Sequence, residues 1–165
     1  MKPHKIKIIF VCLGNICRSP MAEFIFGKLV SDAGLSDRFE ISSAATSDEE
    51  RGNPVYPPAR RKLAEHGIDC SGKTARQLTP ELYLANDYVI GMEKRNITNI
   101  RHIAGHYADG RECRLLDFVD DRGFIASRDI ADPWFTGDFD TAFDEIYRGC
   151  QALLNHLIAT NVCSE

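Results

Sequence analysis

The sequence predicts an α/β protein with three layers: a doubly wound, four-stranded parallel sheet with helices on both faces. One observation is that short β-branched, apolar segments alternate along the chain with amphipathic segments of helical period, which is typical of a parallel sheet. A second is that the chain, at 165 residues, has the length of one such domain. It contains no linker, repeat or low-complexity tract, so residues 1–165 are expected to form a single domain.

The first strand and helix are the most clearly marked elements. Residues 5–11 are rich in β-branched residues and end before a glycine-containing turn, which is typical of a strand. Ser19 and Pro20 suit the N-cap and the first turn of a helix, and Gly34 suits its end. We therefore expect a strand, a short loop and a helix over residues 5–34.

The remaining elements continue the same alternation. Further strands are expected at residues 39–45, 87–92 and 114–119. Further helices are expected at residues 59–66, 80–85, 94–104 and 138–161. Between them lie a loop at residues 46–58 and a long irregular segment at residues 120–137. Long loops in compact domains are often functional, which draws attention to the second segment.

Composition and charge exclude several classes of protein. The formal net charge is −4, so a general affinity for nucleic acid is not expected. The apolar run at residues 8–13 is far shorter than the roughly 20 residues that span a bilayer. Asn15 and Arg18 interrupt what would be the apolar part of a signal peptide. We expect an unprocessed, cytoplasmic protein with neither a nucleic-acid nor a membrane partner.

The cysteines and histidines indicate neither a disulfide framework nor a metal site. The six cysteines form no Cys-x-x-Cys pair, and a chain of this length needs no disulfides to stabilise its core. The five histidines form no His-Glu-x-x-His motif. His102 and His106 share helical spacing, but no carboxylate or cysteine ligand accompanies them. We expect no metal and no other cofactor.

The stretch that follows the first strand has the features of an anion-binding loop. It runs into a helix N-terminus at the carboxyl end of a strand, where ligands bind in open α/β sheets. Gly14 and Asn15 can take the positive-φ conformations that let amides converge on an anion, and Arg18 can grip two phosphate oxygens. No Gly-Lys-Ser/Thr follows, which excludes a Walker loop. The expected phosphate-binding residues are Leu13, Gly14, Asn15, Ile16, Cys17 and Arg18.

Cys12 is the first residue of this loop. Convergent amides, a helix dipole and an arginine all favour a thiolate over a thiol. A thiolate that faces a phosphorus atom held by those amides is positioned for in-line attack. The alternative is a buried structural cysteine beside a helix-capping serine. We interpret Cys12 as a candidate nucleophile and Arg18 as the group that clamps the phosphate.

The string Cys12-Leu-Gly-Asn-Ile-Cys-Arg-Ser-Pro-Met-Ala-Glu23 resembles the low-molecular-weight protein tyrosine phosphatases. The likeness extends through Ser43-Ala-Ala-Thr46, His66-Gly-Ile68, Ala75-Arg-Gln77 and Asp132-Pro133, and so covers nearly the whole chain. It implies a cytoplasmic hydrolase that removes phosphate from phosphotyrosine in proteins through a cysteinyl-phosphate intermediate. Inorganic phosphate would be its product or inhibitor, and no metal would take part.

Asp132 is the candidate general acid and base. The leaving phenolate needs a proton and the second step needs a base to activate water, and one carboxyl can do both in turn. Pro133 biases Asp132 toward an extended backbone, which helps to present the side chain from a loop. Asp120, Asp121 and Asp129 compete on sequence alone, and the Asp-Pro pair of the family favours Asp132.

The resemblance also assigns residues to the substrate cleft and to redox protection. Trp134 and Phe135 are expected to line the cleft, where their rings suit a phenyl phosphate. The alternative for both is simple packing beneath the loop. Cys17 can form a disulfide with the nucleophile in the family and protect it from over-oxidation, or it is a small buried hydrophobe.

Polar residues around the loop resemble the network that supports it in the family. Asn15, Ser19 and Ser43 are expected to hold the loop and assist the thiolate. Ser19 would otherwise be only a helix cap, and Ser43 an ordinary serine at a strand end. Lys73 or a gap stands where many members have a histidine, so the buried network must differ there.

The loop at residues 47–51 also departs from the family pattern. It lacks the aromatic residue of many eukaryotic members, and Glu49 instead places negative charge on the expected cleft wall. We therefore expect weaker binding of acidic phosphopeptides than in relatives with an aromatic loop. The sequence names neither the physiological substrate nor the oligomeric state.

Other functions can share this loop. An arsenate reductase needs further thiols to relay a disulfide, and Cys70 and Cys113 lie far apart in the sequence. A protein arginine phosphatase of the same fold has threonine where this chain has Ile16, and an apolar residue fits a phenyl ester better. The last alternative is a phosphate-binding module without catalytic activity, although the candidate nucleophile, arginine and acid are all present.

Overall fold

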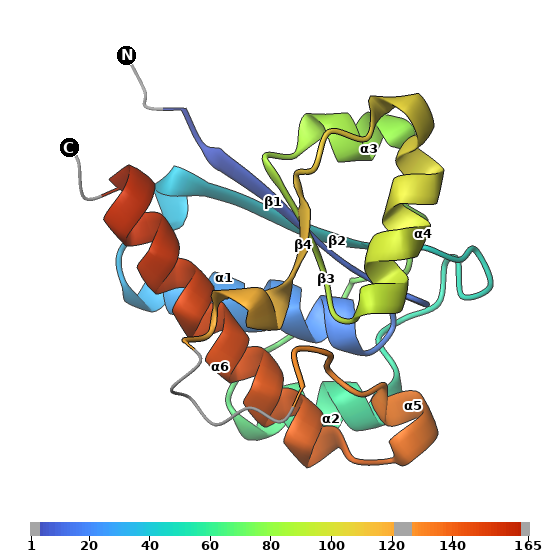
Figure 1. The fold of residues 1–165 in the computed structure, drawn as a ribbon. Helices are drawn as coiled ribbons and strands as arrows, with labels where there is room; N and C mark the ends of the chain where they lie inside the picture. Colours follow the sequence, from blue (N-terminus) through green and yellow to red (C-terminus); the bar gives the residue numbers. More distant parts are fainter. Residues whose placement is uncertain (1–3, 121–126, 163–165) are drawn as a thin grey trace.

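Four parallel strands form the centre of the protein in the computed structural model, which describes residues 4–120 and 127–162 (Figure 1). Their order in the sheet is β2-β1-β3-β4. The strands are β1 (Ile6–Cys12), β2 (Phe39–Ala45), β3 (Tyr88–Gly91) and β4 (Glu112–Arg114). The α-helices are α1 (Arg18–Asp32), α2 (Pro57–Glu65), α3 (Pro80–Ala85), α4 (Lys94–Ala104), α5 (Pro133–Thr136) and α6 (Phe139–Leu157).

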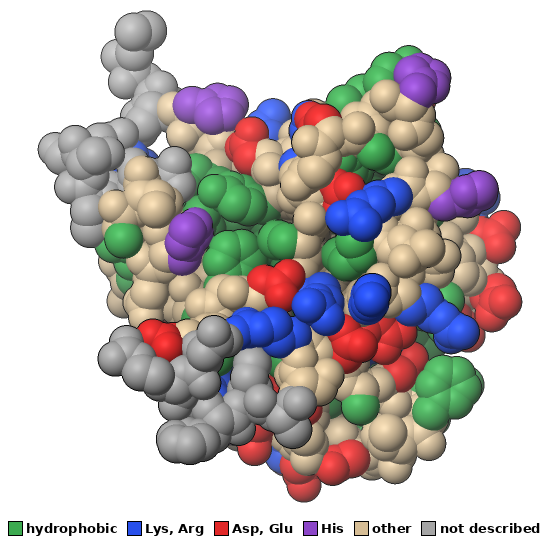
Figure 2. Space-filling model, in the orientation of Figure 1, with side chains coloured by type: hydrophobic (Ala, Val, Ile, Leu, Met, Phe, Trp, Pro, Cys, Tyr) green, Lys and Arg blue, Asp and Glu red, His purple; other side chains and the backbone are tan. Residues whose placement is uncertain are grey.

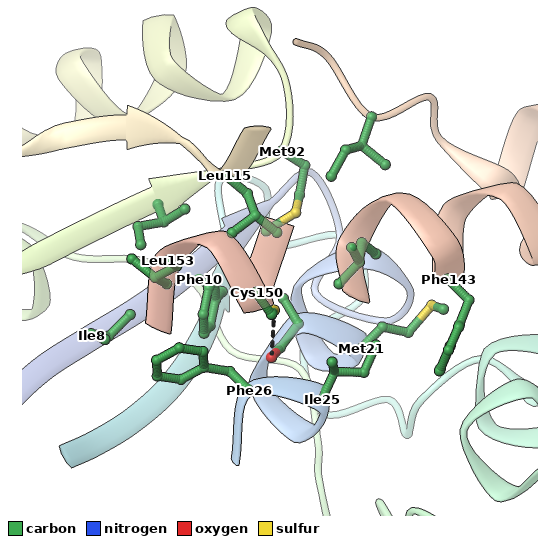
Figure 3. Close-up of a cluster of buried hydrophobic side chains, with 14 of the residues drawn as sticks. Ile8, Phe10, Met21, Ile25, Phe26, Met92, Leu115, Phe143, Cys150 and Leu153 are labelled. Carbon is green, nitrogen blue, oxygen red and sulfur yellow. Dashed lines mark hydrogen bonds between the residues drawn. The ribbon is translucent and has the colours of Figure 1, made fainter. Parts of the chain in front are cut away.

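Helices cover both faces of this sheet because alternate residues of β1 point to opposite sides. Ile8 and Phe10 pack with α1, α2 and α6, and Figure 3 shows Phe10 beside Phe26 of α1 in this layer. Ile9 and Val11 pack on the other side with α3 and α4. All four β1 side chains are fully buried. The predicted three-layer, doubly wound fold is confirmed.

The strand order places a crevice at the carboxyl end of β1. From β1 the chain crosses to β2 on one side, and it later returns to β3 on the other side. The connections therefore diverge at β1, and ligands in doubly wound sheets bind at this kind of switch point. The loop that joins β1 to α1 lies at this end of the strand.

The predicted start of α1 is wrong. The helix begins at Arg18, and Cys17 occupies the N-cap position without a side-chain capping bond. Ser19, the predicted cap, already lies inside the helix. Its hydroxyl instead contacts the Cys12 sulfur at 3.1 Å and accepts a hydrogen bond from the Asn15 amide at 2.8 Å. The Ser19 side chain therefore takes part in the hydrogen bonds around Cys12 and does not cap the helix.

The predicted last strand is also wrong. It was expected at residues 114–119, but the strand ends at Arg114 and a 3₁₀ helix spans Leu115–Phe118. The carboxylate of Asp117 accepts a hydrogen bond from the Arg114 backbone N–H at 2.9 Å and turns the chain. Leu115 and Leu116 are then both fully buried, which a half-exposed strand would not allow.

Other boundaries differ by small amounts. Helix α2 begins at Pro57, which suits the first position of a helix, two residues before the predicted start. Asp138 caps α6, whose α-helical part ends at Leu157 before a π-helical stretch over Ile158–Val162. Within residues 120–137, predicted as irregular, α5 forms one helical turn. None of the helices in the described ranges is long and apolar enough to cross a membrane.

Candidate active site

Asn15 shapes the loop between β1 and α1. Its φ of +59° is the only positive value among the described residues other than glycine. The side chain is buried, and its amide donates to Ser19 Oγ at 2.8 Å and to Ser43 Oγ at 2.9 Å. Its Oδ1 accepts from the Arg76 backbone N–H at 3.1 Å. Three groups from three segments thus hold a backbone conformation that is costly for a residue with a Cβ.

The loop directs hydrogen-bond donors at one sulfur atom. The backbone N–H groups of Asn15 and Ser19 point at Cys12 Sγ, at 3.3 and 3.4 Å, and Ser19 Oγ lies 3.1 Å from it. Such donors stabilise negative charge on sulfur. The backbone N–H groups of Gly14, Ile16 and Cys17 find no acceptor among residues 4–120 and 127–162. They remain available to an anion.

Arg18 is fully buried next to this loop. Its Nη1 donates to the Ile130 carbonyl at 2.8 Å and to Glu93 Oε2 at 3.1 Å. Its Nη2 donates to Asp132 Oδ2 at 3.2 Å. A buried cation needs such partners, and together they fix the guanidinium plane.

Glu93 is a site residue that the sequence analysis missed. It lies just after β3, at the N-cap of α4, where its backbone N–H donates to Asn96 Oδ1 at 3.1 Å. The signal that could have found it is its position. The carboxyl ends of parallel strands share one edge of the sheet, and a carboxylate just after a strand faces the same crevice as the loop after β1.

Asp132 is the aspartate that the structure brings near Cys12. It lines the same cavity as Cys12, and its Oδ1 accepts from the Trp134 backbone N–H at 3.0 Å, so it caps α5. Asp129 instead accepts from the Lys94 backbone N–H at 2.8 Å and from the Arg114 guanidinium at 3.0 Å. Of the other competitors from the sequence, Asp120 does not line the cavity and Asp121 lies outside the described residues.

The cavity above the loop has a volume of about 140 Å³. Its lining includes the predicted cleft residues Glu49, Trp134 and Phe135, and also Glu50, which the sequence analysis did not single out. The Trp134 ring packs on Tyr56, with 4.7 Å between ring centroids, and remains half-exposed. These rings line the cavity and do not pack beneath the loop.

Cys17 lines the cavity beside Cys12, and both cysteines are free. Burial raises the pKa of the Cys17 thiol far above its ordinary value, and negative charge at Cys12 and Asp132 raises it further. Cys17 is therefore a protonated thiol at neutral pH.

The network behind the loop ends in an ion pair. Ser43 Oγ donates to Glu23 Oε1 at 2.5 Å, and the same oxygen lies 3.0 Å from Lys73 Nζ. Lys73 also donates to the Ser43 carbonyl at 3.2 Å. Lys73 thus takes part in the network, which runs from the Cys12 sulfur through Ser19, Asn15 and Ser43 to Glu23.

The described residues contain no group of three or more His, Cys, Asp or Glu side chains that could hold a metal ion. A doubly wound sheet with a thiol on the floor of an anion-binding loop defines a class of proteins, the cysteine-dependent phosphatases.

Comparisons with known proteins agree with this class and narrow it. Residues 7–162 match the family described as low molecular weight phosphotyrosine protein phosphatase. The chain belongs to that family. It is therefore a protein tyrosine phosphatase, a phosphoric monoester hydrolase, and the reaction of the family passes through a cysteinyl-phosphate intermediate.

Relatives match over most of the chain. The low molecular weight protein-tyrosine-phosphatase YfkJ of Bacillus subtilis is 39% identical over 149 residues, which are 90% of this chain and 94% of the relative. The human low molecular weight phosphotyrosine protein phosphatase is 36% identical over 150 residues, 89% of this chain and 92% of that protein. A crystal structure of YfkJ superposes with a TM-score of 0.92 and 36% identity, covering 98% of this chain and 99% of that one.

Proposed function

We propose that Cys12, Arg18 and Asp132 carry out the phosphatase reaction of this chain on proteins that bear phosphotyrosine. The observation that supports this most is the convergence of two backbone N–H groups and a serine hydroxyl on Cys12 Sγ, at the floor of a cavity that also contains Asp132. Inorganic phosphate is the product and binds the same loop as an inhibitor.

In the first step the Cys12 sulfur attacks phosphorus. The S–P bond forms as the bond from phosphorus to the tyrosyl oxygen breaks, and Asp132 gives its proton to that oxygen. The unoccupied amides of the loop and the Arg18 guanidinium stabilise the equatorial oxygens, where charge develops. Tyrosine leaves as the neutral phenol.

In the second step water releases the phosphate. The Asp132 carboxylate takes a proton from water as its oxygen attacks phosphorus, and the S–P bond breaks. The electron pair of that bond returns to Cys12 as a thiolate, which the Asn15 and Ser19 N–H groups and the Ser19 hydroxyl stabilise. Asp132 is protonated again and ready for the next substrate.

The shape of the cavity favours a phenyl ester over other phosphate esters. Trp134, Phe135 and Ile16 line it, so a planar ring meets apolar walls on its way to the sulfur. The short side chain of phosphoserine would leave its phosphate away from Cys12. Ile16 does not favour phosphoarginine as a substrate, because an apolar side chain does not solvate a guanidinium.

Arsenate reduction is not supported by the remaining thiols. Cys70 and Cys113 do not line the cavity that contains Cys12, so neither is placed for a disulfide relay. Cys17 is better placed for redox protection of Cys12, as the resolving thiol of a reversible disulfide. Such chemistry suits a reducing compartment, and we propose that the chain acts in the cytoplasm without nucleic-acid partners.

The test is phosphate release from matched phosphotyrosine, phosphoserine and phosphoarginine peptides, with wild type and Cys12→Ser side by side in EDTA and reductant. Rapid release from phosphotyrosine that disappears in Cys12→Ser is the expected result. Release mainly from phosphoarginine would overturn the substrate, and substantial activity in Cys12→Ser would overturn the nucleophile.

A further inference from the structure

The mouth of the cavity has two chemically different walls. One is the loop after β2, from which Glu49 and Glu50 line the cavity, and the other is α5, which contributes Trp134 and Phe135. In Figure 2, acidic side chains stand at the right-hand edge over that loop, and hydrophobic side chains protrude below them over α5. An acidic wall is unexpected around a site for a dianion, because like charges repel across such distances.

The carboxylate of Glu50 is held in place. Its side chain lies against the phosphate loop, so that a Cβ added to Gly14 would be 3.4 Å from Glu50 Cγ. Asn53 Nδ2 donates to Glu50 Oε2 at 2.6 Å and fixes its orientation. The negative charge also reaches the loop itself, because Glu50 is one of the groups that raise the pKa of Cys17.

Neither glutamate is neutralised by the part of the chain that the structure describes. No lysine or arginine there forms an ion pair with Glu49 or Glu50, and the neighbouring Arg51 does not line the cavity. The Glu49 side chain is exposed, and its backbone N–H donates to Ser47 Oγ at 3.0 Å. Within residues 4–120 and 127–162, the two negative charges thus line the cavity without a counter-ion.

The opposite wall suits a cation as well as a phenyl ring. Phe135 is 75% exposed and Trp134 is 49% exposed, and Tyr56 supports the Trp134 ring from behind. Exposed aromatic faces attract ammonium and guanidinium groups. A lysine or arginine that enters between the two walls would meet carboxylates on one side and rings on the other.

We propose that this cleft selects phosphotyrosine that has a lysine or arginine next to it in the substrate, and disfavours phosphotyrosine with acidic neighbours. The inference rests on the proposed function and specifies its substrate class. The basic neighbour supplies a counter-ion to Glu49 and Glu50, and the same carboxylates repel an acidic neighbour. Exposed charge pairs change affinity by about two- to fivefold each, so the two glutamates predict a preference of roughly tenfold.

The experiment uses three phosphotyrosine peptides of equal length, with lysine, alanine or glutamate on both sides of the phosphotyrosine. The measured quantity is the ratio of kcat/KM between the lysine and glutamate peptides, within each variant. The variants are wild type, the double variant Glu49→Gln/Glu50→Gln, and Asp48→Asn. Asp48 has the same charge in the same loop but does not line the cavity, so it is the matched control.

Wild type is expected to favour the lysine peptide over the glutamate peptide by roughly tenfold, with alanine between them. The double variant should reduce this ratio to about twofold or less, whereas Asp48→Asn should keep most of it. Equal rates on all three peptides in wild type would overturn the inference. An equal loss of the ratio in Asp48→Asn would also overturn the inference. The preference would then depend on the net charge of the loop and not on the two glutamates that line the cavity.

The aromatic wall is tested by Phe135→Leu. This change should slow the lysine peptide by about two- to fivefold more than the alanine peptide, because the cation loses an aromatic face. Equal slowing of both peptides would remove the aromatic part of the inference. If none of the peptides is hydrolysed through Cys12, the proposed function fails. If all are hydrolysed at equal rates, only the selectivity fails.

Discussion

At the scale of single residues, Asn15 combines a backbone role with a side-chain role. Its φ of +59° lets the loop curl so that its own N–H points at Cys12 Sγ. Its side chain then joins Ser19, Ser43 and the Arg76 backbone. The two roles can be separated, because glycine accepts a positive φ without offering the side-chain bonds.

We therefore expect different effects from Asn15→Ala and Asn15→Gly. Both variants should lose roughly tenfold or more in kcat/KM, because the hydrogen bonds that position the loop are gone. Asn15→Gly should be about 1 kcal/mol more stable than Asn15→Ala, because alanine strains the same backbone. Denaturant unfolding and steady-state kinetics give both values. Wild-type kcat/KM in Asn15→Gly would show that the side chain does not support the reaction.

The role of Asp132 is testable through the leaving group. Asp132→Ala should slow an aryl phosphate with a poor leaving group by about 10²–10⁴-fold, because the phenolate then departs without a proton. An ester with a good leaving group should lose much less. Asp129→Asn is the matched control, since Asp129 is bonded to Lys94 and Arg114 and should affect both esters alike. Equal losses on the two esters in Asp132→Ala would point to another acid.

Residues close together in the sequence were the predictable part of the site. The structure places Cys12, Gly14 and Ile16 around one cavity. Arg18 donates to Asp132, which lines the same cavity and which the Asp-Pro pair indicated. Glu93 contacts Arg18 from 75 positions away, and nothing in the local pattern marks that contact. The place of Lys73 in the network also depends on tertiary structure, because it meets Glu23 only after β2 and α1 have packed.

At the scale of elements, local signals decided how well the boundaries could be predicted. The bounds of α3, α4 and β2 agree with the prediction. Thr79 is the N-cap residue of α3, and Glu93 is the N-cap residue of α4. The apolar pair Leu115 and Leu116 misled the prediction of the last strand, since a buried 3₁₀ turn and a buried strand have the same local composition. Only the capping bond from Asp117 distinguishes them.

Helix α6 packs closely on that 3₁₀ turn because Gly149 has no side chain. A Cβ there would lie 2.5 Å from Leu115 Cγ, which is too close for any real contact. Gly149→Ala should therefore lower the free energy of unfolding by about 1–3 kcal/mol, although alanine favours a helix.

Gly27 is the matched control for this prediction. It lies inside α1, and nothing stands within 4 Å of the position that its Cβ would take. Gly27→Ala should raise the free energy of unfolding by about 0.5–1 kcal/mol through helix propensity alone. Urea denaturation of both variants measures the difference. If Gly149→Ala were as stabilising as Gly27→Ala, α6 could not pack as closely as described.

At the scale of the whole molecule, the topology links the site to the core. The connections of the chain diverge at β1, and this strand is buried on both faces, so the loop at its end rests on the centre of the fold. Cys12 is itself part of the core cluster that contains Ile8 and Phe10. The proposed nucleophile, which must face phosphorus along one line, benefits from this support.

Buried thiols make the stability of the protein depend on alkaline pH. Burial raises the pKa of Cys150 and Cys17 far above the ordinary value, and that of Cys113 to about 12. In the unfolded chain these thiols ionise near a pH of roughly 8.5. Their contribution is therefore complete below that pH and is lost as pH rises toward the folded-state pKa, because only the unfolded state releases its protons.

Cys150→Ala isolates one of these contributions. Cys150 is fully buried and donates a weak bond to the Ala22 carbonyl at 3.8 Å (Figure 3), so the variant should be less stable at every pH. Between a pH of about 9.5 and about 10.5, however, its free energy of unfolding should fall less steeply than that of wild type, by about 1 kcal/mol per pH unit. Denaturant unfolding in reductant across this range measures both slopes. Equal slopes would mean that Cys150 ionises as readily in the folded protein as in the unfolded chain.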